Sequence, residues 1–172
     1  CAHADIESVL RGLDRLEIRG RDSAGVSVLV GFGSAAARDA FWADVCDHPD
    51  LGDDARARAD RHALDDGAIA GTGVADAAGI AFVYKVASEV GTIGQNVAAL
   101  REHIQRDPLL ARALAVASTR VNVLGHTRWA SNGIVNTRNA HPQGDTAHDE
   151  PASAAGFLVV LNGDIDNFPR LR

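Results

Sequence analysis

A chain of 172 residues with 46% hydrophobic content is long enough for one domain with a buried core. Its net charge of −6 comes from 17 basic and 23 acidic residues spread along the chain, and without a basic block we expect no nucleic-acid partner. No apolar run approaches the ~20 residues that span a bilayer, and no signal-peptide pattern opens the chain, so the expected compartment is the cytoplasm, with no membrane partner.

The first predicted element is an amphipathic helix over residues 5–17, where apolar side chains recur at steps of three and four. After a turn rich in Arg, Gly and Asp, valines that alternate with small residues predict a strand over 26–30. Residues 34–66 are rich in Ala, Asp and Arg and are split by Pro49 and Gly52. This pattern indicates two short helical stretches in a surface insertion.

The second half of the chain begins with the glycine-rich run 68–79, which is predicted to be a loop, and continues with a predicted strand over 80–86. Helices are expected around 94–105 and 108–117. Two short apolar runs bounded by turn residues, at 121–124 and 157–161, are expected to be buried strands, with buried helix as the alternative that periodicity leaves open. Strands and helices mixed without strict alternation indicate an α+β layered fold.

Three polar segments carry the side chains on which chemistry could depend. They contain the strings RGRDSAG at 19–25, GHTRWASNG at 125–133 followed by NAHP at 139–142, and VVLNGDIDNF at 159–168. In this order, and with Cys1 at the start, they resemble the glutaminase domain of the glucosamine-6-phosphate synthase family, the class II (type 2) glutamine amidotransferases with an N-terminal cysteine nucleophile.

The resemblance covers nearly the whole chain, 1–172, although the stretch from about 33 to 118 matches poorly and contains the insertion at about 34–66. It implies a four-layer αββα fold of the N-terminal-nucleophile (Ntn) hydrolase type, incomplete in this chain. The sugar isomerase domains of the family are absent from it.

Cleavage of a carboxamide requires a nucleophile, a base and donors for the developing oxyanion. Cys1 offers a thiol, and its own α-amine, with a reference pKa of ~7.7–8.0, can serve as the base. Asn162 and Gly163 follow an apolar run and offer a side-chain amide and a backbone N–H. An isolated Asn-Gly pair is more often a plain turn after a strand, but the resemblance assigns the matching pair to the oxyanion hole.

Arg128 is expected in a polar loop directly after a strand, where its planar guanidinium suits a bidentate contact with the α-carboxylate of glutamine. The alternative is a surface pair stacked on Trp129. The resemblance assigns carboxylate binding to the arginine and places the tryptophan on a loop that closes over glutamine. Ser131 and Asn132 replace the threonine and histidine common in the family and are expected to serve as polar substrate contacts.

His126 and His141 flank this loop, and a metal pair or a catalytic base are alternatives for them. Neither is close in sequence to a third ligand, so we assign both to loop structure, as donors to backbone carbonyls, and expect no metal and no cofactor. Arg19, Asp22 and Ser23 are expected to form a buried, hydrogen-bonded turn beneath the nucleophile.

The expected reaction is hydrolysis of glutamine to glutamate and ammonia through a Cys1 thioester. The resemblance implies that the ammonia reaches fructose 6-phosphate in the absent isomerase domains and yields glucosamine 6-phosphate. Two alternatives stay open: a class II amidotransferase with another acceptor, and an inactive glutaminase-like regulatory domain. The second stays open because Cys1 runs directly into the first helix, without the strand that precedes it in the family. Homo-oligomerisation is also left open.

Overall fold

The computed structural model describes residues 2–61, 65–72, 78–88, 92–116, 120–130, 133–145 and 157–163. Its helices are α1 (Ala2–Leu16), the 3-10 turn η1 (Glu17–Arg19), α2 (Ala35–Cys46), α3 (Gly52–Ala59), α4 (Gln95–Arg106) and α5 (Pro108–Ala115). Its strands are β1 (Ser23–Gly31), β2 (Ile69–Thr72), β3 (Gly79–Ala87), β4 (Arg120–Arg128), β5 (Gln143–Asp145) and β6 (Phe157–Val159). No helix in these ranges is long and apolar enough to cross a membrane.

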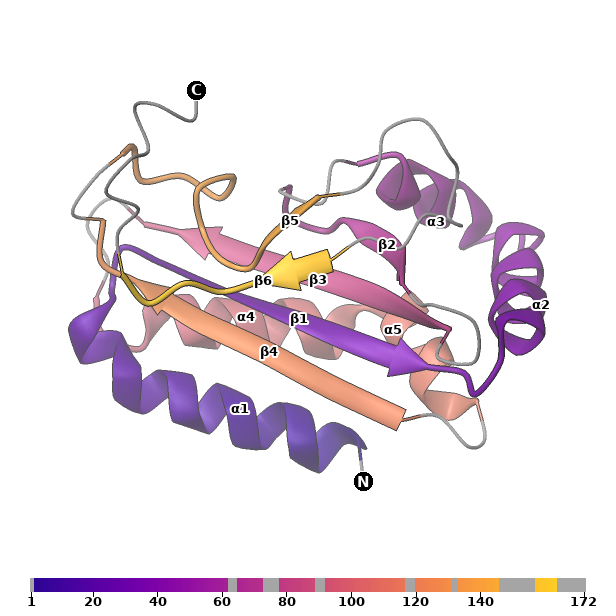
Figure 1. Ribbon diagram of the computed structural model, residues 1–172, viewed down its shortest axis with the longest axis horizontal. Helices are drawn as coiled ribbons and strands as arrows, with labels where there is room; N and C mark the ends of the chain where they lie inside the picture. Colours follow the sequence, from indigo (N-terminus) through magenta and orange to yellow (C-terminus); the bar gives the residue numbers. More distant parts are fainter. Residues whose placement is uncertain are drawn as a thin grey trace.

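Four strands form an antiparallel sheet in the order β2-β3-β1-β4 (Figure 1). β1 lies between its two long partners over its full length: Ser23 faces both Ala87 and Arg128, and Gly31 faces both Gly79 and Arg120. β5 and β6 pair as a separate two-stranded sheet. The valines that predicted a strand at 26–30 therefore belong to an internal strand, which is buried on both faces along most of its length.

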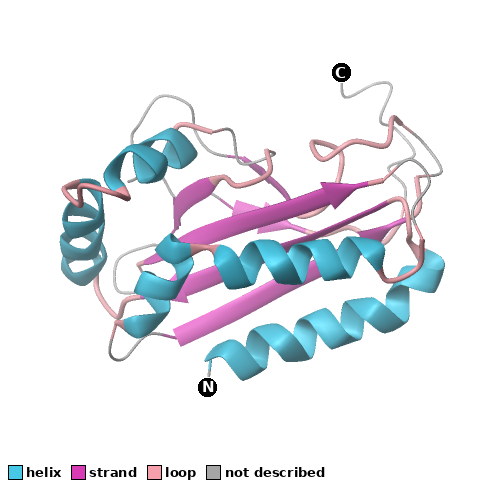
Figure 2. Ribbon diagram, turned by 180° about the vertical axis from the view of Figure 1, so that it is seen from behind, coloured by secondary structure: helices cyan, strands magenta, loops and turns pink. Residues whose placement is uncertain are grey.

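Helices α1, α4 and α5 cover one face of the four-stranded sheet (Figure 2). Alternate residues of the strands point into this layer and meet the apolar faces of the helices. The buried core includes Val26, Val28 and Val30 of β1, Phe82 and Tyr84 of β3, Ile6, Leu10 and Leu13 of α1, Val97 and Leu100 of α4, and Leu109 and Leu110 of α5. The predicted helices at 5–17, 94–105 and 108–117 are thus confirmed, with ends shifted by a few residues.

The two helical stretches predicted within 34–66 are confirmed as α2 and α3, which lie at one end of the sheet (Figure 1). Phe41, Val45 and Ala55 join the buried core. Arg58 of α3 is also buried and binds Asp107 Oδ2 at 2.7 Å. These helices are therefore attached to the main body by both apolar and ionic contacts.

Two predictions about this sheet were wrong. The glycine-rich run 68–79 was predicted to be a loop, but it contains β2. This strand pairs with β3 from Ile69 opposite Phe82 to Thr72 opposite Gly79, and the pairing fixes small residues that have little strand propensity of their own. The strand predicted at 121–124 extends to Arg128, because the register with β1 continues through it. Arg128 is therefore the last residue of β4, and not part of a loop.

The β5–β6 pair lies on the sheet face opposite α1, α4 and α5, where it crosses in front of β1 and β3 (Figure 1). The described chain thus has a helical layer, a four-stranded sheet and a small second sheet. This arrangement confirms the α+β class.

Candidate functional site

The candidate site lies on the sheet face that the helices leave free. Because side chains alternate along strands, Ser23 of β1 and Arg128 of β4 share this face, as do Lys85 of β3 and His126 of β4, which flank Gly25. Polar side chains from three adjacent strands are thereby brought together at one end of the sheet.

Asp22 fixes the chain that leaves β4. Its backbone N–H donates to the carbonyl of Arg128 at 3.2 Å, its carbonyl accepts from the N–H of Ser88 at 2.9 Å, and its carboxylate accepts from the N–H of Ala130 at 2.7 Å. Gly20 lies so close to the Thr127 backbone that an added Cβ would come within 2.8 Å of the Thr127 carbonyl oxygen. The RGRD segment is therefore a clamp on the end of β4.

Arg128 projects from this clamped end toward the segment that follows. A Cβ added at Gly133 would lie 3.4 Å from Nη2 of Arg128, and Gly133 has a φ of +85°, which side chains rarely adopt. A glycine here lets the backbone approach the guanidinium. Trp129, the next residue, is 62% exposed, an unusual state for so large an apolar side chain.

The rings of His126 and His141 pack against each other beside Arg128, with ring centroids 4.5 Å apart and the ring planes tilted by 50°. His126 is hydrogen-bonded to the backbone of Leu161 and His141 to the backbone of Val159. Burial lowers the pKa of His126, and burial with the nearby His126 lowers the pKa of His141 to about 4. Both rings are therefore neutral at pH 7. The assignment of these histidines to structure, as partners of the backbone, agrees with this geometry.

Gly25 makes room for the second histidine. A Cβ at Gly25 would collide with the backbone carbonyl of His141, so only glycine allows this segment to cross β1. The crossing point lies between Lys85 and His126 on the neighbouring strands. Gly25, the last residue of RGRDSAG, thus lets this segment contact His141 of the NAHP segment.

Three buried polar atoms at this site have no hydrogen-bond partner among the residues that the structure describes: Ser23 Oγ, His126 Nδ1 and His141 Nδ1. Buried polar atoms are nearly always paired, by protein, water or ligand. Because both histidines use their other ring nitrogen on the backbone, each Nδ1 is left as an acceptor. The face therefore offers polar groups to a small polar molecule or to water.

Asn162 and Gly163 come directly after the segment that the two histidines hold. Both are exposed, and Gly163 has a φ of +153° with open space where a side chain would lie. The structure thus brings the Asn-Gly pair to the same end of the sheet as Arg128.

Three predicted site residues, Cys1, Ser131 and Asn132, lie outside the described residues. Ala2 is described, and it begins α1, whose 15 residues span about 22 Å. The opposite end of α1 leads into the turn that clamps β4, so Ala2 lies at the end of the helix away from Arg128 (Figure 1).

Two further residues differ from expectation. Arg19 is exposed, so the prediction that it is buried in the turn was wrong; its position in η1 directs it to solvent, whereas Ser23 is buried in β1. Lys85, which the motifs did not include, is 1% exposed on the site face. The signal for it was the alternation of Ala81, Val83 and Lys85 along β3, which places the lysine on an otherwise apolar inner face.

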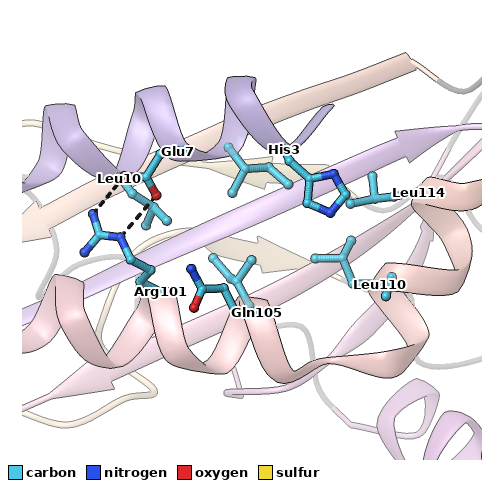
Figure 3. A pocket seen from close by; sticks show the side chains of 10 residues that line it. His3, Glu7, Leu10, Arg101, Gln105, Leu110 and Leu114 are labelled. Carbon is cyan, nitrogen blue, oxygen red and sulfur yellow. Dashed lines mark hydrogen bonds and ion pairs between the residues drawn. The ribbon is translucent and has the colours of Figure 1, made fainter. Parts of the chain in front are cut away.

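A cavity of about 500 Å³ lies on the helical side of the sheet, between α1, α4 and α5 (Figure 3). Its wall is mainly apolar, with Leu10 and Leu110 in it, and Glu7 and Arg101 lie on its rim. Arg101 is paired to Glu7 at 3.1 Å and to Asp14 at 3.0 Å. This cavity is separated from Arg128 by the sheet, so it is not part of the candidate site.

Sequence comparison relates the chain to aminotransferases. The similar proteins are named glutamine–fructose-6-phosphate aminotransferase (isomerizing): that of Caulobacter vibrioides is 34% identical over 89 residues, that of Mycobacterium tuberculosis 36% over 97, and that of Symbiobacterium thermophilum 47% over 49. These matches cover 52%, 56% and 28% of this chain. The resemblance inferred from the three segments is therefore confirmed.

The matched region spans only 13%, 14% and 7% of those three relatives. No family model matches the chain, and no solved structure matches it. The similarity thus concerns a small part of each relative.

Proposed function

We propose that this chain is part of a class II glutamine amidotransferase and supplies its glutaminase half. The observation that carries the proposal is the gathering of Arg128, the His126–His141 pair and the Asn162-Gly163 segment at one end of a sheet, in a chain similar to glutamine–fructose-6-phosphate aminotransferases. The small second sheet over the free face is consistent with an αββα Ntn hydrolase fold of which this chain forms part.

In the proposed reaction, the thiolate of Cys1 attacks the carboxamide carbon of glutamine after its proton passes to the α-amine of the same residue. Asn162 Nδ2 and the N–H of Gly163 donate to the oxyanion of the tetrahedral intermediate. The C–N bond breaks, the amine proton passes to the leaving nitrogen, and ammonia departs from a thioester. Water then cleaves the thioester and releases glutamate.

Arg128 is proposed to bind the α-carboxylate of glutamine, since its guanidinium lies beside Gly133 at the clamped end of β4. Trp129, which is largely exposed, is proposed to belong to a loop that closes over the bound substrate with Ser131 and Asn132. Ammonia is proposed to pass to fructose 6-phosphate in isomerase domains outside this chain. A different ammonia acceptor is the alternative for this last step.

One observation favours a second candidate function, an inactive glutaminase-like regulatory domain. Ala2 begins α1 at the end of the helix away from Arg128, and the 15 residues of α1 span about 22 Å. The first described residue thus lies far from the end of the sheet where Arg128 and the Asn162-Gly163 segment gather.

Labelling with a glutamine-analogue diazo-ketone separates the two functions. The protein with its native N-terminus should form a covalent adduct at Cys1 and none at Cys46, and should release ammonia from glutamine. Cys1→Ser is the matched control for the nucleophile. Failure to label Cys1, together with no ammonia release, would refute the amidotransferase and favour the regulatory domain. Formation of glucosamine 6-phosphate from added fructose 6-phosphate tests the acceptor separately.

A further inference from the structure

Lys85 is the buried cation on the site face whose role neither the motifs nor the proposed reaction explains. It is 1% exposed, although it lies on the side of the sheet away from the helical core. A buried ammonium group costs free energy unless charged and polar groups surround it. The groups around the Lys85 ammonium should therefore show which part of the structure this charge stabilises.

The carboxylates that attract Lys85 come from the chain just before β2. Asp65 and Asp66 both favour its charged form, although burial outweighs them and lowers the pKa of Lys85 to about 8. Asp66 Oδ1 also accepts from the backbone N–H of Lys85 at 2.6 Å. The 65–67 segment is thus fixed alongside β3, with two carboxylates near the ammonium group.

Asp65 also reaches the segment that crosses the site. Arg138 Nε lies 3.6 Å from Asp65 Oδ1, but the two side chains are 60% and 43% exposed, so this ion pair by itself adds little to the attachment of residues 133–143. This segment also carries His141, whose backbone crosses Gly25 next to Lys85, and Gly133, which lies against Arg128. Ala140 is fully buried and accepts from Gln143 Nε2 at 2.8 Å, so the segment is packed onto the sheet.

We propose that Lys85 is a positioning residue for the candidate site: its buried side chain, beside the point where the His141 backbone crosses Gly25, holds the 133–143 segment on the sheet, so that Gly133 abuts Arg128 and His141 supports the strand before Asn162. This inference rests on the proposed glutaminase function for its catalytic consequence. Its structural part, the holding of residues 133–143 by Lys85, does not depend on that function.

A positioning role differs from a role in global stability. Lys85→Met removes the charge but keeps an unbranched side chain of similar length, and Asp65, which is 43% exposed, can still be hydrated in the variant. The free energy of unfolding should therefore change little, while residues 133–143 are loosened. Lys85→Arg, which keeps the charge, should hold residues 133–143 largely as the parent protein does. Arg106→Gln, at an exposed cation of α4, is the matched control.

Two measurements on these variants test the proposal. Hydrogen exchange of the amides in 133–143 should be roughly tenfold faster in Lys85→Met than in the parent, with Lys85→Arg and Arg106→Gln near the parent value. In glutamine hydrolysis, Lys85→Met should raise KM roughly tenfold and change kcat by less than about threefold, because substrate binding loses its preformed site.

The outcomes distinguish the positioning role of Lys85 from the proposed glutaminase function. If the parent protein does not hydrolyse glutamine, the proposed function fails, and hydrogen exchange alone decides on Lys85. If exchange in 133–143 is unchanged in Lys85→Met, the positioning role is overturned, whether or not glutamine is hydrolysed. Loss of global stability in Lys85→Met without faster local exchange also overturns it, because the lysine would then support the fold as a whole.

Discussion

Asp107→Asn should destabilise the fold by about 3 kcal/mol, although the substitution changes one atom. The Asp107 carboxylate is 6% exposed and accepts from Arg58 Nη2 at 2.7 Å and from the Tyr84 hydroxyl at 2.6 Å through Oδ2. Its other oxygen caps α5 through the backbone N–H groups of Leu109 and Leu110. Asparagine is as good an N-cap, so this substitution retains the cap and removes the charge.

The loss of stability is large because Arg58 stays buried without its charged partner. Arg58 is 7% exposed, and without Asp107 its nearest carboxylate, that of Asp54, is 3.7 Å away. Breaking a buried pair by removing one partner typically costs about 3–5 kcal/mol, and loss of a cap adds about 1 kcal/mol. Asp107→Ala should therefore be more damaging than Asp107→Asn by about the value of the cap.

Urea unfolding followed by circular dichroism measures these free energies, with Asp53→Asn at an exposed position of α3 as the control. The double variant Arg58→Met with Asp107→Asn should lose much less than the sum of the single variants. Burial alone would raise the pKa of Asp107, but the bonds from Arg58 and Tyr84 outweigh it and lower that pKa. The stabilisation should thus be present above the ordinary carboxyl range and be lost as pH falls. Additive single and double variants would refute this reasoning.

Three further predictions concern the site. Arg128→Lys should raise the KM for glutamine much more than it lowers kcat, because lysine keeps the charge without the two-pronged contact; steady-state kinetics in which kcat alone falls would contradict this. Asn162→Ala should lower kcat by ~10²–10³-fold with little change in substrate binding, and near-normal kcat would return the Asn-Gly pair to a plain turn. The pKa of His141 is about 4 when folded and 6.5 when unperturbed, so its neutral form should contribute about 3 kcal/mol above pH 6.5 that is lost between pH 6.5 and 4. His141→Gln should weaken this acid dependence in pH-resolved unfolding, and an unchanged slope would count against it.

The helices were predictable because their signal is local. The apolar steps of three and four in 5–17 describe the same face that α1 buries, and Asp107-Pro108 is a readable helix start, with the cap before the proline. β2 and the end of β4 were not predictable in this way. Gly71 and Gly125 become strand residues only because partners distant in the sequence pair with them.

The residues of the candidate site divide in the same way, into those that the local sequence identifies and those that only the tertiary structure reveals. The motif strings identify Arg128 and Asn162, because arginine and an Asn-Gly pair are chemically suggestive on their own. Nothing local in the sequence shows that Gly25 must accommodate the backbone of His141, or that Lys85 lies beside this contact. Both facts depend on a segment that crosses the sheet, and this crossing is a property of tertiary structure.

The position of β1 in the sheet has a consequence for synthesis of the protein. β1 is made early, yet its partner β4 follows roughly a hundred residues later along the chain, and the residues that cross its free face come later still. Pairings so distant in sequence form slowly, because the intervening chain must first be ordered. On the ribosome, β1 would therefore wait with both edges unpaired until β3 and β4 emerge. An apolar strand with unpaired edges can pair with wrong partners. Helix α1 is also made early, but it packs against β4 in the finished fold, so it cannot protect β1 before β4 is made.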